Sequence, residues 1–410
     1  MTDPNPLFLP PEPIARRVVI DTPQAYRDAV AVLAAGHGPF GVDAERASGF
    51  RYSQRAYLVQ VFRRGAGSFL FDPPAIGDFS ALSAVMAGEE WILHAASQDL
   101  PCLRELGLDP SVIFDTELGA RLAGLPRVGL GAVVEDLLGI HLKKEHSAAD
   151  WSTRPLPHAW LEYAALDVEL LPDLRDSVAE RLAAGGKLEA AQQEFQAVLD
   201  KQPVERTDAW RRLTGLHTIR SPRALAIARA LWRARDDYAR EIDSAPGRLV
   251  PDAALVAAAA ANPATKRDLA QIKAFTGRAS RSQLDRWFAA IEAGRAEDDL
   301  PVMRPPSDQL PPPRIWGDRN PEADLRLRGV RPQLAELAES MDLPLENLLT
   351  PDIVRRIAWS PPQPIAVTTI ASALAGLGAR PWQIHATAEL ISRVFLNPPQ
   401  LPPTPSEQGS

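Results

Sequence analysis

The feature that most constrains the fold is a change of pattern near residue 205. Before it, short runs rich in β-branched and aromatic residues alternate with amphipathic segments, and after it only helical periodicity remains. The strand-like runs are FGVDAE, YLVQVF, SFLFD and WILHA, at 40–45, 57–62, 68–72 and 91–95. Strands joined by short turns and then strand–helix alternation predict an α/β domain with a mixed sheet flanked by helices, followed by one or two all-α domains.

Local composition sets the expected domain boundaries. We expect a flexible segment at 1–14, an α/β domain at 15–200, a helical domain at 206–295, a proline-rich linker at 298–320, a second helical domain at 321–397 and a disordered tail at 398–410. These boundaries follow from proline-rich stretches and from the end of the strand patterns.

The first long helix of the second half has a clear start. Ser221 and Pro222 supply a capping hydroxyl and a proline at the first helical position, and the helix is predicted to run to Ile242. Its apolar residues fall on one arc, and beside that arc lies a stripe of Arg229, Arg233 and Arg240. We take these three arginines as candidate nucleic-acid contacts.

Charge is distributed unevenly along the chain. Residues 1–205 carry 18 basic and 29 acidic side chains (net −11), residues 206–295 carry 17 and 9 (net +8), and residues 296–410 carry 10 and 14 (net −4). A compact basic domain in an acidic chain indicates binding to a polyanion. The alternative is a chance excess on helix surfaces, because the 39 Arg against 6 Lys also fit GC-rich coding.

Several classes of protein are excluded or disfavoured. The single cysteine, Cys102, excludes an internal disulfide and a multi-cysteine zinc site, and we expect it to be buried in packing. No run approaches the length of a membrane span, and the first residues lack the pattern of a secretory signal. We therefore expect a cytoplasmic bacterial protein. A helicase is excluded because the chain has no G-x-x-x-x-G-K-[ST] loop.

The first candidate site is Asp43-Ala44-Glu45, inside an apolar strand. Alternate residues of a strand share a face, so both carboxylates point the same way. Burying two like charges is costly unless metals or hydrogen bonds compensate them. The alternative is an ordinary surface pair.

Two further candidates follow along the chain. Asp99 lies where an apolar strand runs into a helix, and it could simply complement the helix dipole after a Ser97 cap. Tyr163 and Asp167 are four residues apart, on one face of a helix that is expected to cover 159–182. Each feature alone is more often structural than functional.

Taken in chain order, the three features resemble the DEDD exonuclease superfamily, whose fold is a ribonuclease-H-like α/β domain. The segments GVDAE, YLVQVF, LHAASQDL, FDT, DWSTRPL and EYAALDV, at 41–45, 57–62, 93–100, 114–116, 150–156 and 162–168, resemble the bacterial ribonuclease D family. WRRL at 210–213 and RALAIARALWR at 223–233 resemble the HRDC domain, a small helical nucleic-acid-binding module. The segment 321–397 would be a second HRDC-like unit.

The resemblance implies a metal-dependent 3′→5′ exoribonuclease that trims RNA 3′ ends, such as those of tRNA precursors, and releases nucleoside 5′-monophosphates. It also assigns the residues. Two divalent cations, Mg²⁺ or Mn²⁺, would be held by Asp43, Glu45, Asp99 and Asp167. Tyr163, four residues before the last acid, places the chain in the tyrosine branch and would orient the attacking water; Glu162 stands where the other branch has histidine.

The remaining residues near these motifs have open roles. Lys144 and Arg154 either contact a phosphate or are structural, and His94 is expected in packing or hydrogen bonding. Asp115 is expected to set the turn after its strand. Two alternative functions stay open: an exonuclease of DNA or mixed substrates, and a non-catalytic RNA-binding protein on the same fold.

Overall fold

The computed structural model describes residues 17–142, 148–202, 207–275, 277–304 and 308–399. Two compact units make up the chain, and each is described by itself. The first comprises Met1–Gly49, Gln54–Thr116 and Gly129–Ser177, and the second comprises Phe50–Ser53, Glu117–Val128 and Val178–Ser410. No helix in these described ranges is long and apolar enough to cross a membrane.

A mixed sheet forms the centre of the first unit. Its strands are β1 (Val19–Ile20), β2 (His37–Arg46), β3 (Ala56–Arg64), β4 (Gly67–Phe71), β5 (Glu90–Leu93) and β6 (Val112–Asp115). Their order is β1-β4-β3-β2-β5-β6, with β2 antiparallel to β3 and parallel to β5. The predicted mixed sheet flanked by helices is therefore confirmed, and the central strand β2 carries the Asp-x-Glu pair.

The remaining elements up to residue 200 are helical. They are α1 (Pro23–Ala35), α2 (Pro73–Ile76), α3 (Ser80–Met86), η1 (Ala96–Gln98), α4 (Leu100–Glu105), α5 (Thr116–Leu122), α6 (Leu130–Leu138), α7 (His158–Glu169), α8 (Leu171–Ala184) and α9 (Leu188–Asp200). The helix that we expected over 159–182 is divided into α7 and α8 at Leu170.

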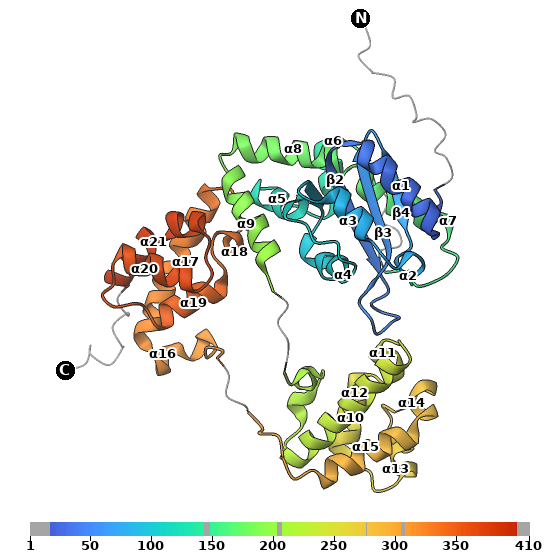
Figure 1. Ribbon diagram of the computed structural model, residues 1–410. Helices are drawn as coiled ribbons and strands as arrows, with labels where there is room; N and C mark the ends of the chain where they lie inside the picture. Colours follow the sequence, from blue (N-terminus) through green and yellow to red (C-terminus); the bar gives the residue numbers. More distant parts are fainter. Residues whose placement is uncertain (1–16, 143–147, 203–206, 276, 305–307, 400–410) are drawn as a thin grey trace, which may run out of the picture. The chain divides into compact units, whose positions relative to one another are not determined.

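Helix α7 packs against strands β2, β3 and β4 (Figure 1). Gly41 of β2 permits this approach, because a Cβ atom at that position would lie 2.8 Å from the carbonyl oxygen of Val168. Gly41 shares a face of β2 with Asp43 and Glu45, since alternate residues point the same way. The close contact therefore brings α7 to the face of the sheet that bears both acids.

The first helical bundle is built around α10. Its elements are η2 (Ala209–Arg212), η3 (Leu216–Thr218), α10 (Pro222–Glu241), α11 (Pro246–Leu249), α12 (Asp252–Ala261), α13 (Lys266–Gln271), α14 (Arg278–Ser282) and α15 (Leu284–Ala296). The Ser221 hydroxyl accepts a hydrogen bond from the Ala224 N–H at 3.1 Å, as its capping role predicts. Trp210, Phe275 and Trp287 are buried in the core of this bundle.

A second bundle follows, coloured orange to red in Figure 1. Its elements are η4 (Pro313–Ile315), α16 (Trp316–Arg319), α17 (Pro321–Ser340), α18 (Leu345–Leu348), α19 (Pro351–Trp359), α20 (Val367–Gly376) and α21 (Pro381–Leu396). Trp316 is fully buried, and its ring lies edge-on to Trp359 with the centroids 4.9 Å apart. The end of the segment that we expected to be a linker, 298–320, is thus part of this bundle's core. The tail from residue 400 on lies outside the described residues.

Candidate active site

Strand β2 and helix α7 bring three of the predicted acids together. Asp43 and Glu45 lie on one face of β2, and Asp167 lies on α7. One carboxylate oxygen from each of these three residues falls within 4.8 Å of the others, close enough to bind a common metal ion. All three side chains are partly exposed, so the group is open to solvent.

The fourth acid, Asp99, joins the group through Asp43. It stands at the N-terminus of α4 but its carboxylate caps no backbone N–H, and Ser97 lies inside η1 rather than at a cap position. The expected Ser97 cap is therefore not formed, although Asp99 does stand at the helix N-terminus. Asp99 is 6% exposed, is hydrogen-bonded to Asp43, and has an oxygen 3.7 Å from the guanidinium Nη2 of Arg46.

Burial and mutual repulsion hold protons on this cluster when no metal is bound. Desolvation, followed by the charge of Asp43, raises the pKa of both Asp99 and Asp167 to about 8. Burial and the charges of its acidic neighbours raise the pKa of Glu45 well above its usual value, and burial also raises the pKa of Asp43. A cluster that binds protons this tightly also favours cations.

The donor set fits hard divalent cations. Among the residues that the structure describes, it consists of carboxylate oxygens alone, without His or Cys, and these are the ligands that Mg²⁺ and Mn²⁺ prefer. Arg46 is the cationic side chain that lowers the pKa of Asp43, Glu45 and Asp99, but it only partly offsets burial. The residues present therefore suit a metal centre.

Tyr163 lies one helical turn before Asp167. Its phenol is hydrogen-bonded to the Asp167 carboxylate, and burial, followed by the charges of Asp167 and Glu45, raises its pKa above the usual value. The hydroxyl is therefore a hydrogen-bond donor at the edge of the acid group. Glu162, at the alternative position, instead accepts a hydrogen bond from Arg17 Nε at 3.2 Å.

Gln60 lies beside the acid group, and sequence reasoning did not single it out. It faces Asp43 across the β2–β3 pair, so the two side chains share a face of the sheet. Gln60 is 0% exposed, and neither atom of its amide has a hydrogen-bond partner among the described residues. The available signal was a polar residue inside the otherwise apolar run YLVQVF.

Asp115, at the end of β6, holds the turn that presents Asp99. It is 3% exposed, and its carboxylate accepts hydrogen bonds from the backbone N–H of Ala95 at 3.0 Å and of Ala96 at 2.9 Å. Ala95 has φ +65°, a left-handed conformation that a non-glycine residue adopts only when the surroundings fix it. Asp115 therefore fixes the turn that follows β5, whereas we expected it to set the turn after its own strand, β6.

Two other neighbours of the acids have structural contacts. His94 Nδ1 lies 2.9 Å from the hydroxyl oxygen of Thr116, in agreement with a hydrogen-bonding role. Cys102 is buried, and burial raises the pKa of its thiol to about 12, so the group stays protonated and is a poor nucleophile.

The two residues predicted to contact phosphate, unlike the acids, are not placed at the site by the structure. Lys144 lies outside the described residues. Arg154 donates its Nε–H to Asp72 at 2.6 Å and its remaining groups to backbone carbonyls, including that of Tyr57 at 2.8 Å. Because its guanidinium already has these partners, Arg154 has a structural role and the predicted phosphate contact is not supported.

The three arginines predicted to contact nucleic acid from α10 are not all accessible. Arg229 is 8% exposed and forms an ion pair with Glu297 at 2.7 Å, so it is a buried structural residue and the prediction of a nucleic-acid contact is wrong for it. Arg240 is exposed and pairs with Asp236 at 3.0 Å. Arg233 is exposed and has no ion pair in the part of the chain that the structure describes.

Three family models match this chain. The family described as 3′-5′ exonuclease matches residues 18–183, the HRDC domain matches residues 224–291, and the family described as 3′ to 5′ exonuclease C-terminal domain matches residues 309–395.

Individual relatives cover most of the chain. The ribonuclease D of Granulibacter bethesdensis is 32% identical over 308 residues, which is 70% of this chain and 74% of that protein. A solved structure of a protein from Bifidobacterium adolescentis has 38% identity and a TM-score of 0.85, and the match covers 92% of this chain and 96% of that one. Escherichia coli RNase D, described as an exoribonuclease involved in structured RNA processing, has 24% identity and a TM-score of 0.68, with 94% and 100% covered.

Proposed function

Because the chain belongs to the ribonuclease D family, we propose that its four clustered acids form the catalytic centre of a 3′→5′ exoribonuclease. The observation that carries this assignment is the convergence of Asp43, Glu45 and Asp167 within 4.8 Å. Asp99 completes the set through its hydrogen bond with Asp43. The family resemblance expected from the sequence is confirmed. The non-catalytic alternative is therefore set aside.

The four acids would hold two divalent cations, Mg²⁺ or Mn²⁺. Such ions supply Lewis acidity and lower the pKa of a bound water, which makes a nucleophile available near neutral pH. The role of the chain is to fix the ligands: β2 presents two of them, α4 the third and α7 the fourth. Once ionised, the four carboxylates would repel a phosphodiester, so the cations are also needed to hold the scissile phosphate at the acids.

Tyr163 would orient the attacking water. A phenol whose pKa is raised by burial stays protonated at neutral pH, and it is therefore a poor general base. It can donate a hydrogen bond, and Asp167 already holds it in position. Arg17 engages Glu162 outside the acid group, which supports Tyr163 as the residue that positions the nucleophile.

The substrate would be RNA with a free 3′ end, such as a tRNA precursor, and the product a nucleoside 5′-monophosphate. The basic helical module supports this proposal, because residues 206–295 carry a net charge of +8. Such a module binds phosphates whatever the sequence. The acids contact the phosphodiester and do not read the sugar, so the choice between RNA and DNA needs a direct experiment.

A time course on labelled strands tests this function. The full chain is incubated with 5′-labelled RNA and with matched DNA, in Mg²⁺, in Mn²⁺ and in EDTA, beside the Asp43→Asn variant. We expect RNA to shorten one nucleotide at a time from its 3′ end, only with metal and only with the unchanged chain. Hydrolysis in EDTA or by Asp43→Asn would contradict the assignment, and equal hydrolysis of DNA would leave a mixed-substrate enzyme.

A further inference from the structure

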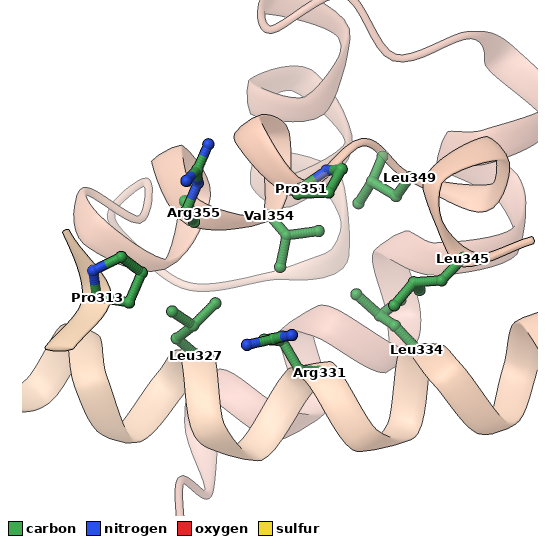
Figure 2. Close-up of a pocket in the computed structure, with 9 residues that line it drawn as sticks. All are labelled: Pro313, Leu327, Arg331, Leu334, Leu345, Leu349, Pro351, Val354 and Arg355. Atoms are coloured by element: carbon green, nitrogen blue, oxygen red, sulfur yellow. The ribbon is translucent and has the colours of Figure 1, made fainter. Parts of the chain in front are cut away.

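The second helical bundle contains a pocket of about 190 Å³. It lies between α17, α18, α19 and η4, and Figure 2 shows the side chains that line it. Its apolar surface comes mainly from Leu327, Leu334, Leu349 and Val354. The pocket is therefore well suited to a compact apolar group.

Two arginines give the pocket a positive charge. The guanidinium of Arg331 lies between Leu327 and Leu334 (Figure 2) and has no hydrogen bond or ion pair among the described residues. Arg331 is exposed, so its donors are open to a ligand that arrives from solvent. Arg355 lies across from it with its guanidinium directed away from the cavity (Figure 2), and its Nη2 donates to Asp352 at 3.3 Å. The pocket therefore combines an apolar interior with one unpaired guanidinium, that of Arg331, for an anion.

The size of the pocket limits the ligand. A cavity of about 150 Å³ with apolar walls binds benzene, while pockets for drug-sized molecules begin at about 300 Å³. One ring system fits here, together with an anionic group that reaches Arg331. A nucleotide has both parts, since a planar base is joined to a phosphate.

We propose that this pocket binds one nucleoside monophosphate unit, with the base among the leucines and the phosphate on Arg331. This choice of ligand rests on the proposed exoribonuclease function, which brings nucleotides to the protein. The unit has two sources: a released 5′-monophosphate, or an unpaired nucleotide within the RNA. Both present the same chemistry to the pocket, and the experiment separates them.

Calorimetry with AMP in EDTA tests the site, because without metal the acid cluster has no cation to hold a phosphate. We expect AMP to bind the full chain, and we expect Arg331→Ala and Val354→Phe each to weaken binding about tenfold or more. Arg328→Ala, on the same helix and with an exposed side chain paired to Asp324 at 2.8 Å, is the matched control and should bind normally. Absence of AMP binding at millimolar concentration, or normal binding by Arg331→Ala, would overturn the proposal.

RNA binding then separates the two sources. In an Asp43→Asn background, an RNA ligand that uses the pocket loses affinity on Arg331→Ala and is competed by AMP. Unchanged RNA affinity together with AMP binding identifies the released nucleotide as the ligand. Because AMP binding is measured without metal, it remains interpretable even if the chain has no nuclease activity, so the two proposals fail independently.

A second inference concerns Gln60 and rests on a separate observation. Gln60 faces Asp43 on one side and Leu70 on the other across neighbouring strands, and it is fully buried. Both amide atoms lack a partner among the described residues, whereas buried amides are normally hydrogen-bonded. An apolar side chain of the same shape would suit this position better for stability.

We infer that Gln60 is a positioning residue of the catalytic centre. Side chains directly opposite each other in an antiparallel pair lie close together, so Gln60 lies beside Asp43, and its amide has no other partner among the described residues. When a metal draws the Asp43 carboxylate into place, the amide would be the neutral donor that orients it without adding charge. Its effect on the metal passes through Asp43.

The test compares stability with metal binding. Gln60→Met keeps the volume and removes the amide, so we expect the thermal midpoint without metal to stay equal or rise. Mn²⁺ affinity should fall about tenfold, and kcat should fall with KM unchanged. Leu70→Met, opposite Gln60 on β4, is the control and should keep its Mn²⁺ affinity. A loss of stability with normal Mn²⁺ affinity would make Gln60 a structural residue and overturn the inference.

Discussion

The phenol of Tyr163 and the carboxylate of Asp167 are one helical turn apart and hydrogen-bonded. Removal of the phenol hydroxyl alone therefore separates the role of the tyrosine from that of the metal ligand. Tyr163→Phe keeps the ring and removes the hydroxyl. We expect the single-turnover rate to fall about 10²-fold, because the water loses its orienting donor, while RNA affinity and metal dependence change little. Rapid-quench kinetics measure the rate. Full activity in this variant would show that the tyrosine only packs α7 onto the sheet.

Asp115 acts on the site through two backbone N–H groups, and its isostere tests that role. Asp115→Asn presents an amide N–H to one of the two donors, so the turn at Ala95 loses a hydrogen bond and Asp99 shifts. We expect Mn²⁺ affinity, measured by calorimetry, to fall about tenfold. Asp109→Asn, at an exposed position paired with Arg104, is the matched control. Normal Mn²⁺ binding by Asp115→Asn would contradict the role.

The raised pKa values predict how metal-free stability depends on pH. Asp99 and Asp167 have folded pKa values of about 8, while in the unfolded chain aspartate titrates near 4. Between these values the folded protein holds the protons and the unfolded chain does not, so the cluster lowers stability as pH rises from about 4 to about 8. Divalent metal should offset this loss.

Thermal melts in EDTA, at intervals through that pH range, measure the effect. The relevant quantity is the difference between the unchanged chain and Asp167→Asn, which removes one ionisable group. We expect the variant to gain stability relative to the unchanged chain as pH rises, by several degrees in the midpoint. A difference that stays constant with pH would mean that Asp167 ionises normally in the folded protein.

The sequence pointed to the acids but not to the residues that support them. Asp43, Glu45, Tyr163 and Asp167 became candidates because strand alternation and helical spacing are local properties, and the family resemblance then assigned their roles. Gln60 depends on its pairing with another strand, which the sequence does not specify. Arg229 was misassigned for the same reason, since its partner Glu297 comes far later in the chain.

At the scale of elements, the site depends on how closely α7 approaches β2. Gly41→Ala places a Cβ atom 2.8 Å from the Val168 carbonyl oxygen, so the helix must move away and take Asp167 with it. We expect metal affinity and turnover to fall together, by about 10²-fold in turnover, with a loss of stability. Gly49→Ala, where the Cβ meets open space, is the control. Normal turnover by Gly41→Ala would show that the helix tolerates the shift.

Elements with strong local patterns were predictable, and short or proline-rich ones were not. The four predicted strands correspond to β2, β3, β4 and β5, whereas β1 has only two residues, which is too short for a periodicity to be recognised. The segment 298–320 was interpreted as a linker because of its prolines, but burial of Trp316 makes its end part of a core. That burial depends on Trp359, which the local sequence does not reveal.

At the scale of the whole molecule, the basic character of residues 206–295 predicts how RNA affinity responds to salt. Arg212, Arg220 and Arg233 are exposed and have no ion pair in the described part of the chain. If they contact phosphates, replacing all three by Gln reduces the log–log salt slope by about 0.7 for each, or about 2 in total, for single-stranded RNA. Affinity should fall most at low salt, because fewer counterions are released on binding.

The control for that experiment removes the same number of positive charges from a different domain. Arg314, Arg319 and Arg328 are exposed residues of the second bundle, and replacing them by Gln also removes three positive charges. Binding is measured in the Asp43→Asn background, so that RNA is not consumed, over a series of salt concentrations. We expect the first variant to lose slope and the second to keep it. Equal losses would mean that total charge alone controls binding, and an unchanged slope in the first variant would assign the basic bundle a role other than phosphate contact.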